Sequence, residues 1–264
     1  MNKDLIDNPA LWRLGLLIGP GAIDVLAHRV VGEAPAVQGR IPYDPAATSP
    51  AAALEEAVYA NPMLLMPFRT VDIALRAPQA VAAPADTDPA ALARLLKTDP
   101  ANAILADTLD SRHSILYALD KGIVNFLGRT FDTQPRHVLG IMCSYYSRPA
   151  RRSNASRMYI DISDTHIDVL VLDTTGPAAA ATFACSTTDE QAYYALSVFT
   201  SARLDPHTDQ ITVSGHAEAR RELCRRLSAF VSCVMPAIPP AGLYRGDPAA
   251  LAAPMPLLLL PLCE

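Results

Sequence analysis

The residue types that most often carry out chemistry are spread thinly along this chain. Five cysteines stand at widely spaced positions without a Cys-x-x-Cys pair, so they form neither a disulfide framework nor a zinc ligand set. Six histidines lack the His-x-x-x-His spacing that places two imidazoles on one helix face. The P-loop motif and the Gly-x-Ser-x-Gly turn of serine hydrolases are both missing. We therefore expect no dedicated metal site and no nucleophilic serine.

Among the acidic residues, Asp161 has the clearest candidate role. It lies at the end of an apolar run over residues 158–162, just before the turn Ser163-Asp164-Thr165. A carboxylate at the end of a strand can hold Mg²⁺ through water. It can equally accept hydrogen bonds from the N–H groups of its own turn, which is the commoner arrangement. Both roles stay open.

A repeat relates the surroundings of Asp161 to the beginning of the chain. With an offset of 144 residues, residues 14–32 align without a gap on residues 158–176, and six of these nineteen positions are identical. Four identities form an Ile-Asp-Val-Leu block after the turn in each half, which makes Asp24 and Asp168 equivalent. Because both halves carry this aspartate, we expect it to serve the hairpin or the sheet edge of each half rather than a catalytic centre.

The expected elements also follow the same order in both halves. The first half has three strands, a helix and a strand, over residues 14–18, 23–31, 36–41, 51–60 and 71–75. The second half has three strands, a helix, a strand and a final helix, over residues 158–162, 167–172, 178–185, 189–202, 211–213 and 217–227. Between these series we expect a short helix from Asp88, strands over 103–106 and 114–119, a helix over 121–131 and a strand over 137–143. The tail after Pro236, rich in proline and leucine, is expected to pack as extended chain.

Three consecutive strands followed by a helix and a strand make up the ribonuclease H-like unit, and two such units in tandem build the architecture of actin and of sugar kinases. We therefore predict an α/β fold of two tandem ribonuclease H-like lobes, each a mixed sheet that begins with three consecutive strands and is flanked by helices. The first lobe is expected over residues 1–150. The second is expected over residues 151–264, including the tail. A polar segment over 147–157, with four arginines, is expected to be an exposed connector.

The second half resembles the actin-like ATPase domain at the nucleotide motifs of that superfamily. Residues 159–169 resemble its second phosphate hairpin, and residues 211–217 resemble its adenosine motif. The whole chain is similar to an uncharacterised bacterial family, domain of unknown function 3822, with a ribonuclease H-like fold. The resemblance implies a cleft between the lobes, to which the candidate binding residues Gly19, Gly21, Asp161, Asp164, Thr165 and Gly215 would contribute.

Several positions depart from the pattern of an active member of the superfamily. In active members, glycine-rich hairpins bring N–H groups to the phosphates, and a strand carboxylate helps to hold metal and water. Here Pro20 removes one N–H group, and the carboxylate of the first strand falls near Leu17. Asp164 would bring negative charge toward the phosphates, and His216 replaces the second glycine of the adenosine motif. We therefore expect no cofactor and no ATP hydrolysis, with Mg-ATP binding as the alternative.

Composition narrows the classes of partner. The net charge of −5 gives no general attraction to nucleic acid or to anionic lipid. No apolar stretch approaches the ~20 residues of a membrane helix, and the N-terminus lacks the pattern of a secretory signal. Cysteines of this spacing are typical of reduced thiols. We expect a cytoplasmic bacterial protein with a protein partner, no membrane association and no nucleic acid; the oligomeric state stays open.

Three functions are compatible with these residues. The leading hypothesis is a non-catalytic actin-like scaffold or binding protein with degenerate nucleotide motifs. The first alternative is an active nucleotide-dependent ATPase or kinase, for which Asp161 would be essential. The second is a metal-dependent ribonuclease H-like nuclease, which requires Asp161 to converge with another acid such as Asp209 or Glu190.

Overall fold

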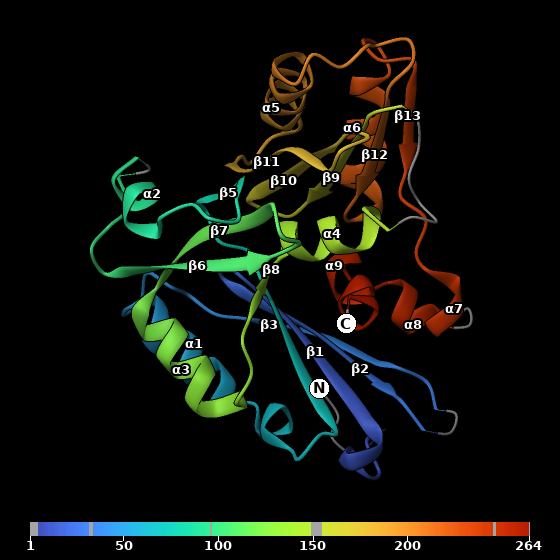
Figure 1. The fold of residues 1–264 in the computed structure, drawn as a ribbon. Coiled ribbons are helices and arrows are strands. Elements are labelled where there is room, and N and C mark those ends of the chain that lie inside the picture. Colours follow the sequence, from blue (N-terminus) through green and yellow to red (C-terminus); the bar gives the residue numbers. More distant parts are fainter. Residues whose placement is uncertain (1–4, 32–33, 96, 149–154, 245–246, 264) are drawn as a thin grey trace.

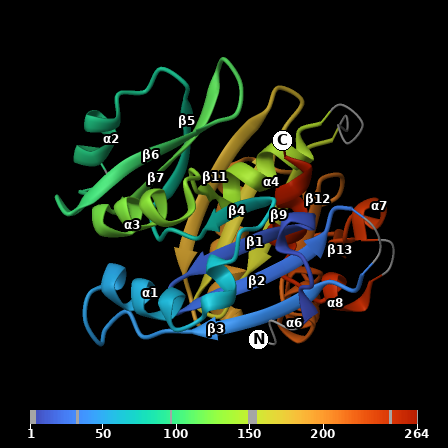
Figure 2. The same ribbon diagram turned by 90° about the horizontal axis from the view of Figure 1, so that it is seen from below.

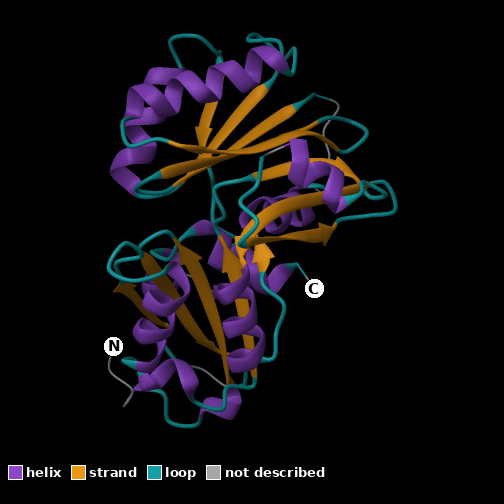
Figure 3. Ribbon diagram, turned by 90° about the vertical axis from the view of Figure 1, so that its left-hand side faces the viewer, coloured by secondary structure: helices purple, strands orange, loops and turns teal. Residues whose placement is uncertain are grey.

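Two mixed β-sheets form the framework of the protein (Figures 1 and 3). The structure is a computed structural model that describes residues 5–31, 34–95, 97–148, 155–244 and 247–263. Residues 149–154 of the expected arginine-rich connector lie outside the described residues.

The first sheet begins with an antiparallel hairpin. The chain reverses at Pro20-Gly21, where Gly21 takes a φ of +97° that favours glycine. A third strand pairs antiparallel with the second, and two later strands add on in parallel. The sheet order is β3-β2-β1-β4-β8, formed by β1 (Trp12–Gly19), β2 (Ala22–Arg29), β3 (Val37–Pro42), β4 (Thr70–Leu75) and β8 (Arg136–His137).

The second sheet repeats this plan. Its first five strands have the order β11-β10-β9-β12-β13, with the same sequence of antiparallel and parallel pairings. They are β9 (Arg157–Ile162), β10 (His166–Leu172), β11 (Pro177–Ala184), β12 (Gln210–Ser214) and β13 (Cys233–Pro236). The predicted α/β fold of two ribonuclease H-like lobes is confirmed by this shared topology.

The hairpin registers of the two sheets match at the offset found in the sequence. Leu17 pairs with Asp24 in the first hairpin, and Asp161 pairs with Asp168 in the second. Residues that the repeat aligns therefore occupy equivalent positions in the two sheets.

An additional three-stranded unit extends the second sheet. Its strand β5 pairs antiparallel with β11 at Val81 and Ala181, and β7 and β6 follow in antiparallel order (Figure 2). These strands come from the first half of the chain, so the second sheet joins residues of both halves. The unit consists of β5 (Ala80–Pro84), α2 (Pro89–Leu95), β6 (Asn102–Thr108), β7 (His113–Asp120) and α3 (Lys121–Phe131).

Helix ends follow local capping signals. The Ser49 hydroxyl accepts the Ala52 N–H at the start of α1 (Pro50–Tyr59), and Thr187 with Glu190 forms a capping box at α5 (Thr188–Ser201). Helix α6 (Ala217–Leu227) packs beside α5 over the second sheet. Short 3₁₀ turns cover Pro9–Leu11 and Pro62–Leu65. None of the helices in the described ranges has the length and apolar character needed to cross a bilayer.

The strand expected over residues 137–143 is wrong. Only Arg136–His137 is extended, and α4 (Val138–Tyr146) follows directly. Seven of its residues are buried, on all sides of the helix. An apolar run that is buried all round shows neither the helical nor the strand period, so its pattern could not distinguish the two.

The tail is also different from the expected extended chain. It forms the short helices α7 (Ala241–Tyr244), α8 (Pro248–Leu251), α9 (Met255–Leu259) and a 3₁₀ turn over Leu260–Leu262. Figure 1 shows α8 and α9 beside the strands of the first sheet. Their buried side chains join the hydrophobic core of that sheet, and Leu257 approaches Gly15 on β1 so closely that a Cβ there would lie 3.3 Å from it. The division of the chain at residue 150 stays a prediction.

Candidate functional site

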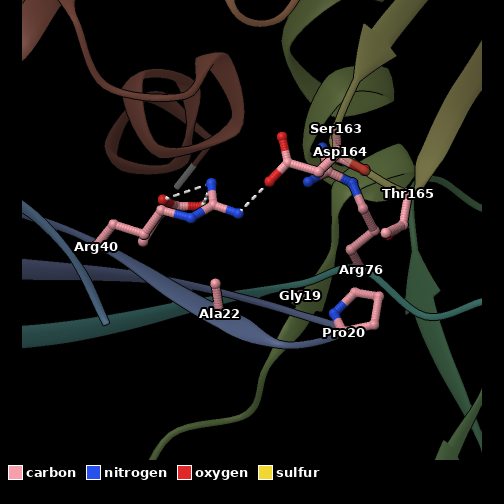
Figure 4. Close-up of a pocket in the computed structure, with 9 residues that line it drawn as sticks. Gly19, Pro20, Ala22, Arg40, Arg76, Ser163, Asp164 and Thr165 are labelled. Carbon is pink, nitrogen blue, oxygen red and sulfur yellow. Dashed lines mark hydrogen bonds and ion pairs between the residues drawn. The ribbon is translucent and has the colours of Figure 1, made fainter. Parts of the chain in front are cut away.

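The turns of the two equivalent hairpins face each other across a small pocket. Gly19 and Pro20 line it from the first hairpin, and Ser163, Asp164 and Thr165 line it from the second (Figure 4). Its volume is about 40 Å³. The remaining lining residues are Ala22, Asp24, Arg40 and Arg76.

Arg76 connects the two sheets, because its backbone belongs to the first sheet and its side chain contacts the second. It follows the last residue of β4, and its N–H donates to the Ile18 carbonyl (2.9 Å), which extends the β1–β4 pairing by one bond. Its Nε donates to Asp168 Oδ2 at 2.7 Å, and its Nη2 donates to Asp161 Oδ2. One guanidinium therefore bridges two carboxylates that belong to the second hairpin.

This ion-paired cluster is almost completely shielded from water. The exposed side-chain fractions are 6% for Arg76, 3% for Asp161 and 0% for Asp168. Low local dielectric strengthens the attraction, but removing three charges from water costs free energy, so the net stabilisation depends on full hydrogen bonding.

The second oxygen of each carboxylate has its own donor. Ser214, which pairs with Asp161 in the β9–β12 register, donates its hydroxyl to Asp161 Oδ1 at 2.6 Å. Thr182, which pairs with Asp168 in the β10–β11 register, donates to Asp168 Oδ1 at 2.6 Å. Both carboxylates are thus held by a neighbouring strand on one side and by Arg76 on the other.

Burial and the neighbouring charges act in opposite directions on these groups. Burial raises the pKa of Asp161, against the lowering effects of Arg76 and Ser214. Burial works to lower the pKa of Arg76, but Asp168 and Asp161 outweigh it and raise that pKa. The guanidinium therefore stays charged, and it favours the ionised form of Asp161.

A second arginine connects the hairpins at the rim of the pocket. Arg40 on β3 lies 3.3 Å from Asp24 Oδ1, and its Nη2 also donates to Asp164 in the opposite turn (Figure 4). The Arg40 side chain is half exposed, so solvent weakens this bridge relative to the buried one. Asp24 and Arg40 are a cross-strand pair, as Asp168 and Thr182 are in the other sheet.

The residues of this site do not fit a magnesium nucleotide. About 40 Å³ holds roughly one water molecule, whereas ligand pockets usually measure ~300–1,000 Å³. Arg76 occupies the space between Asp161 and Asp168, where a cation would need their oxygens. Within the described residues, no group of three or more His, Cys, Asp or Glu side chains has the geometry to hold a metal ion.

The candidate binding residues from the sequence divide into two groups. Gly19, Asp164 and Thr165 line the pocket, and Asp161 lies behind Arg76. Gly21 is not a lining residue; its carbonyl accepts the Tyr43 N–H (2.9 Å).

Gly215 also lies outside the lining of the pocket. It takes a φ of +126°, and an added Cβ would lie 2.8 Å from the Ile162 carbonyl oxygen. It therefore allows β12 to end closely against β9. The assignment of these six residues as a binding site stays a prediction.

Sequence reasoning missed the residues that dominate the site. Arg76 is not among the candidates from the sequence. Asp168 was expected to serve the hairpin or the sheet edge; it lies on β10, between β9 and β11, where it contacts Arg76 and Thr182. The available signal was a charged residue directly after the apolar strand over residues 71–75. A buried strand that ends in an arginine requires a buried acid nearby, and Asp168 lies inside an otherwise apolar run.

The two acids named for the nuclease alternative hold other parts of the chain. Asp209 precedes β12 and accepts hydrogen bonds from the N–H groups of Ser156 and Asp205. It lies five residues, or ~16 Å, along the sheet from the position of Asp161. Glu190 caps α5. The nuclease alternative stays a prediction, and neither Asp209 nor Glu190 supports it in this structure.

Comparisons with known proteins agree with this fold. A family model described as a protein of unknown function, DUF3822, matches residues 36–234. A Bacteroides thetaiotaomicron protein of unknown function with an actin-like ATPase fold is similar, with 17% identity, a TM-score of 0.79 and 97% of each chain covered. No curated protein sequence matches the chain.

Two further solved structures have lower similarity. A chain of the PilM–PilN type IV pilus biogenesis complex is 17% identical with a TM-score of 0.61, and 97% of this chain and 100% of that chain are covered. An activator of 2-hydroxyisocaproyl-CoA dehydratase from Clostridium difficile, with bound ADPNP, is 10% identical with a TM-score of 0.44, and 94% and 93% of the two chains are covered. At 17% identity, the likeness to the PilM–PilN chain shows the fold alone.

Proposed function

The chain belongs to the DUF3822 family of proteins of unknown function, and we propose that it is a non-catalytic actin-like protein that acts by binding a protein partner. The observation that carries this proposal is the position of Arg76, whose guanidinium takes the place between two carboxylates at the facing hairpins.

Phosphoryl transfer in this fold class depends on positioning and on electrostatic stabilisation of charge on the phosphates. That chemistry requires carboxylate oxygens available to a cation and N–H donors available to phosphate. Here both oxygens of Asp161 and of Asp168 already accept hydrogen bonds. Pro20 contributes no N–H group, and Asp164 brings negative charge to the pocket. Each of these features opposes the alternative of an active ATPase or kinase.

Binding of a protein partner is supported by the architecture. The similar PilM–PilN structure is a complex, so a two-lobed protein of this fold can act by holding another protein. The net charge of −5 favours a protein partner over nucleic acid. The five cysteines form no disulfide in the structure, which supports an assignment to a reducing compartment such as the cytoplasm.

Thermal unfolding in the presence of Mg-ATP tests the proposal. We expect the midpoint temperature of the wild-type protein to stay unchanged up to millimolar Mg-ATP, because a ligand that does not bind the folded state cannot stabilise it. Phosphate release should equal the rate without protein. A saturable rise in the midpoint that Asp161→Asn abolishes would overturn the proposal and favour the nucleotide-dependent alternative.

A further inference from the structure

A second and much larger pocket lies away from the facing hairpins. It has a volume of about 460 Å³ and forms where four distant segments meet: the β6–β7 turn, the end of α4, the β10–β11 turn and the tail. This volume lies within the range of pockets that enclose small organic ligands. Its lining includes the polar residues Asp110, Arg112, Arg136, Ser144, Arg148 and Cys263.

Three guanidinium groups line this pocket. Arg112 comes from the β6–β7 turn, Arg136 precedes α4, and Arg148 follows α4. Unlike Arg76 and Arg40, none of the three forms an ion pair with a carboxylate among the described residues. Within the described ranges, therefore, no carboxylate forms an ion pair with these three guanidinium groups.

The one acidic side chain in the lining faces its own turn. Asp110 Oδ1 accepts the N–H groups of Arg112 (2.7 Å) and His113 (2.9 Å), and the carboxylate lies 3.0 Å from His113 Nδ1. These contacts shape the β6–β7 turn and use the oxygens of Asp110 locally. The Asp110 carboxylate therefore forms no ion pair with the three arginines, and its one negative charge stays below their combined positive charge.

Neighbouring groups hold the three arginine side chains but accept hydrogen bonds from only a few of their N–H donors. Arg136 donates from Nη1 to the Cys263 carbonyl (3.1 Å) and from Nη2 to Ser144 Oγ (2.8 Å). Arg112 donates one bond to the Thr175 carbonyl (3.4 Å), and Arg148 lies over the Tyr145 ring with 5.9 Å to its centroid. A guanidinium carries five N–H donors, so most of the donor capacity of the pocket is not used by these contacts.

We propose that this pocket binds a small organic anion whose carboxylate or phosphate group is held by Arg112, Arg136 and Arg148, with Ser144 as an additional donor. Paired N–H donors on a planar guanidinium match the oxygens of such groups, and charge-assisted hydrogen bonds of this kind are stronger than neutral ones. Apolar lining from Leu109 and Pro177 suits the organic part of the ligand.

The ligand would contact all four segments around the pocket. It would join the added β5–β7 unit, α4, the β10–β11 turn and the tail, which are otherwise distant in the sequence. Binding should therefore stabilise the folded protein as a whole. This site is independent of the pocket at Arg76, and either proposal can fail without the other.

Calorimetric titration with citrate and, separately, with inorganic phosphate tests the proposal. We expect saturable binding of at least one probe by the wild-type protein; citrate alone indicates a carboxylate ligand and phosphate alone a phosphate ligand. The double variant R112Q/R148Q should bind at least tenfold more weakly. R225Q is the matched control, because Arg225 is an exposed arginine on α6. Arg136 is left intact because it holds the tail.

A second measurement uses the wild-type protein alone. Cys263 lines the pocket, so the bound probe should slow alkylation of its thiol by iodoacetamide, measured by mass spectrometry, while Cys224 on α6 keeps its rate. Absence of saturable binding for both probes would overturn the proposal. Equal binding by the double variant and R225Q, without protection of Cys263, would overturn it too.

Discussion

Buried carboxylates in this protein are held by partners on other elements. Asp161 and Asp168 share Arg76, and Asp107 on β6 connects the added β5–β7 unit to α4. Asp107 Oδ2 accepts the His137 N–H at 2.7 Å, and the Tyr117 hydroxyl lies 3.4 Å from Oδ1. These side chains position elements, which is a structural use of acids in a fold where strand-end acids are also the natural candidates for catalysis.

The burial of Asp107 predicts that the stability of the protein depends on pH. Burial raises the pKa of Asp107 to about 6, so the folded state holds this proton more tightly than the unfolded state. The group therefore contributes stability at low pH that is lost as pH rises from about 4 to about 6. The free energy of unfolding of Asp107→Asn, relative to that of the wild type, should therefore rise by roughly 2–3 kcal/mol between pH 4 and pH 6. Urea unfolding at pH 4, 5, 6 and 7 measures this difference. A difference between the two proteins that does not vary with pH would contradict this.

Single residues were also the hardest part of the site to predict. The repeat identified the turns that face each other, because identical residues at one offset mark equivalent positions. It could not identify Arg76, which lies outside the aligned residues 14–32 and whose partners lie 85 and 92 residues later. The role of such a residue depends on how the two sheets are placed, which a pattern within one segment does not contain.

At the scale of elements, the two hairpins show how much the sequence predicts. Their strands and turns were predicted from the apolar runs, the turn residues and the repeat. The pairing of Leu17 with Asp24 and of Asp161 with Asp168 comes from the structure. The helix α4 was mistaken for a strand because it is buried on all sides. Its amphipathic neighbour α3 was predicted at its observed bounds, since one face is apolar and Asp120 caps it.

The close contact between the ends of β12 and β9 predicts a loss of stability when a side chain is added at Gly215. In Gly215→Ala the new Cβ would meet the Ile162 backbone at 2.8 Å, and alanine disfavours a φ of +126°. We expect the free energy of unfolding to fall by about 1–3 kcal/mol or more. The control is Gly128→Ala on the exposed face of α3, where nothing lies within 4 Å of the new Cβ. That change should stabilise by up to ~1 kcal/mol; equal effects of the two substitutions would contradict this assignment.

At the scale of the molecule, the Arg76 cluster and the tail connect parts that the repeat treats as separate. Arg76 links the end of β4 to the second hairpin, and the tail helices join the core of the first sheet. The repeat predicted two lobes, but it carried no information on a tail that has no counterpart in the first half. A buried arginine shared by two acids constrains how the sheets meet, and this closed arrangement is the basis of the proposed non-catalytic function.

The most direct test of this account measures whether Arg76 and its two acids stabilise the fold as one unit. Arg76→Met alone should lower the free energy of unfolding by roughly 3–5 kcal/mol at pH 7, because it leaves two buried carboxylates without their cation. Adding Asp161→Asn and Asp168→Asn to Arg76→Met should recover a large part of this loss, since the charges are then removed together. The free energies of unfolding of the three single variants are measured as well. If the loss in the triple variant equals the sum of the three single losses, Arg76 is not paired with these carboxylates and the account is contradicted.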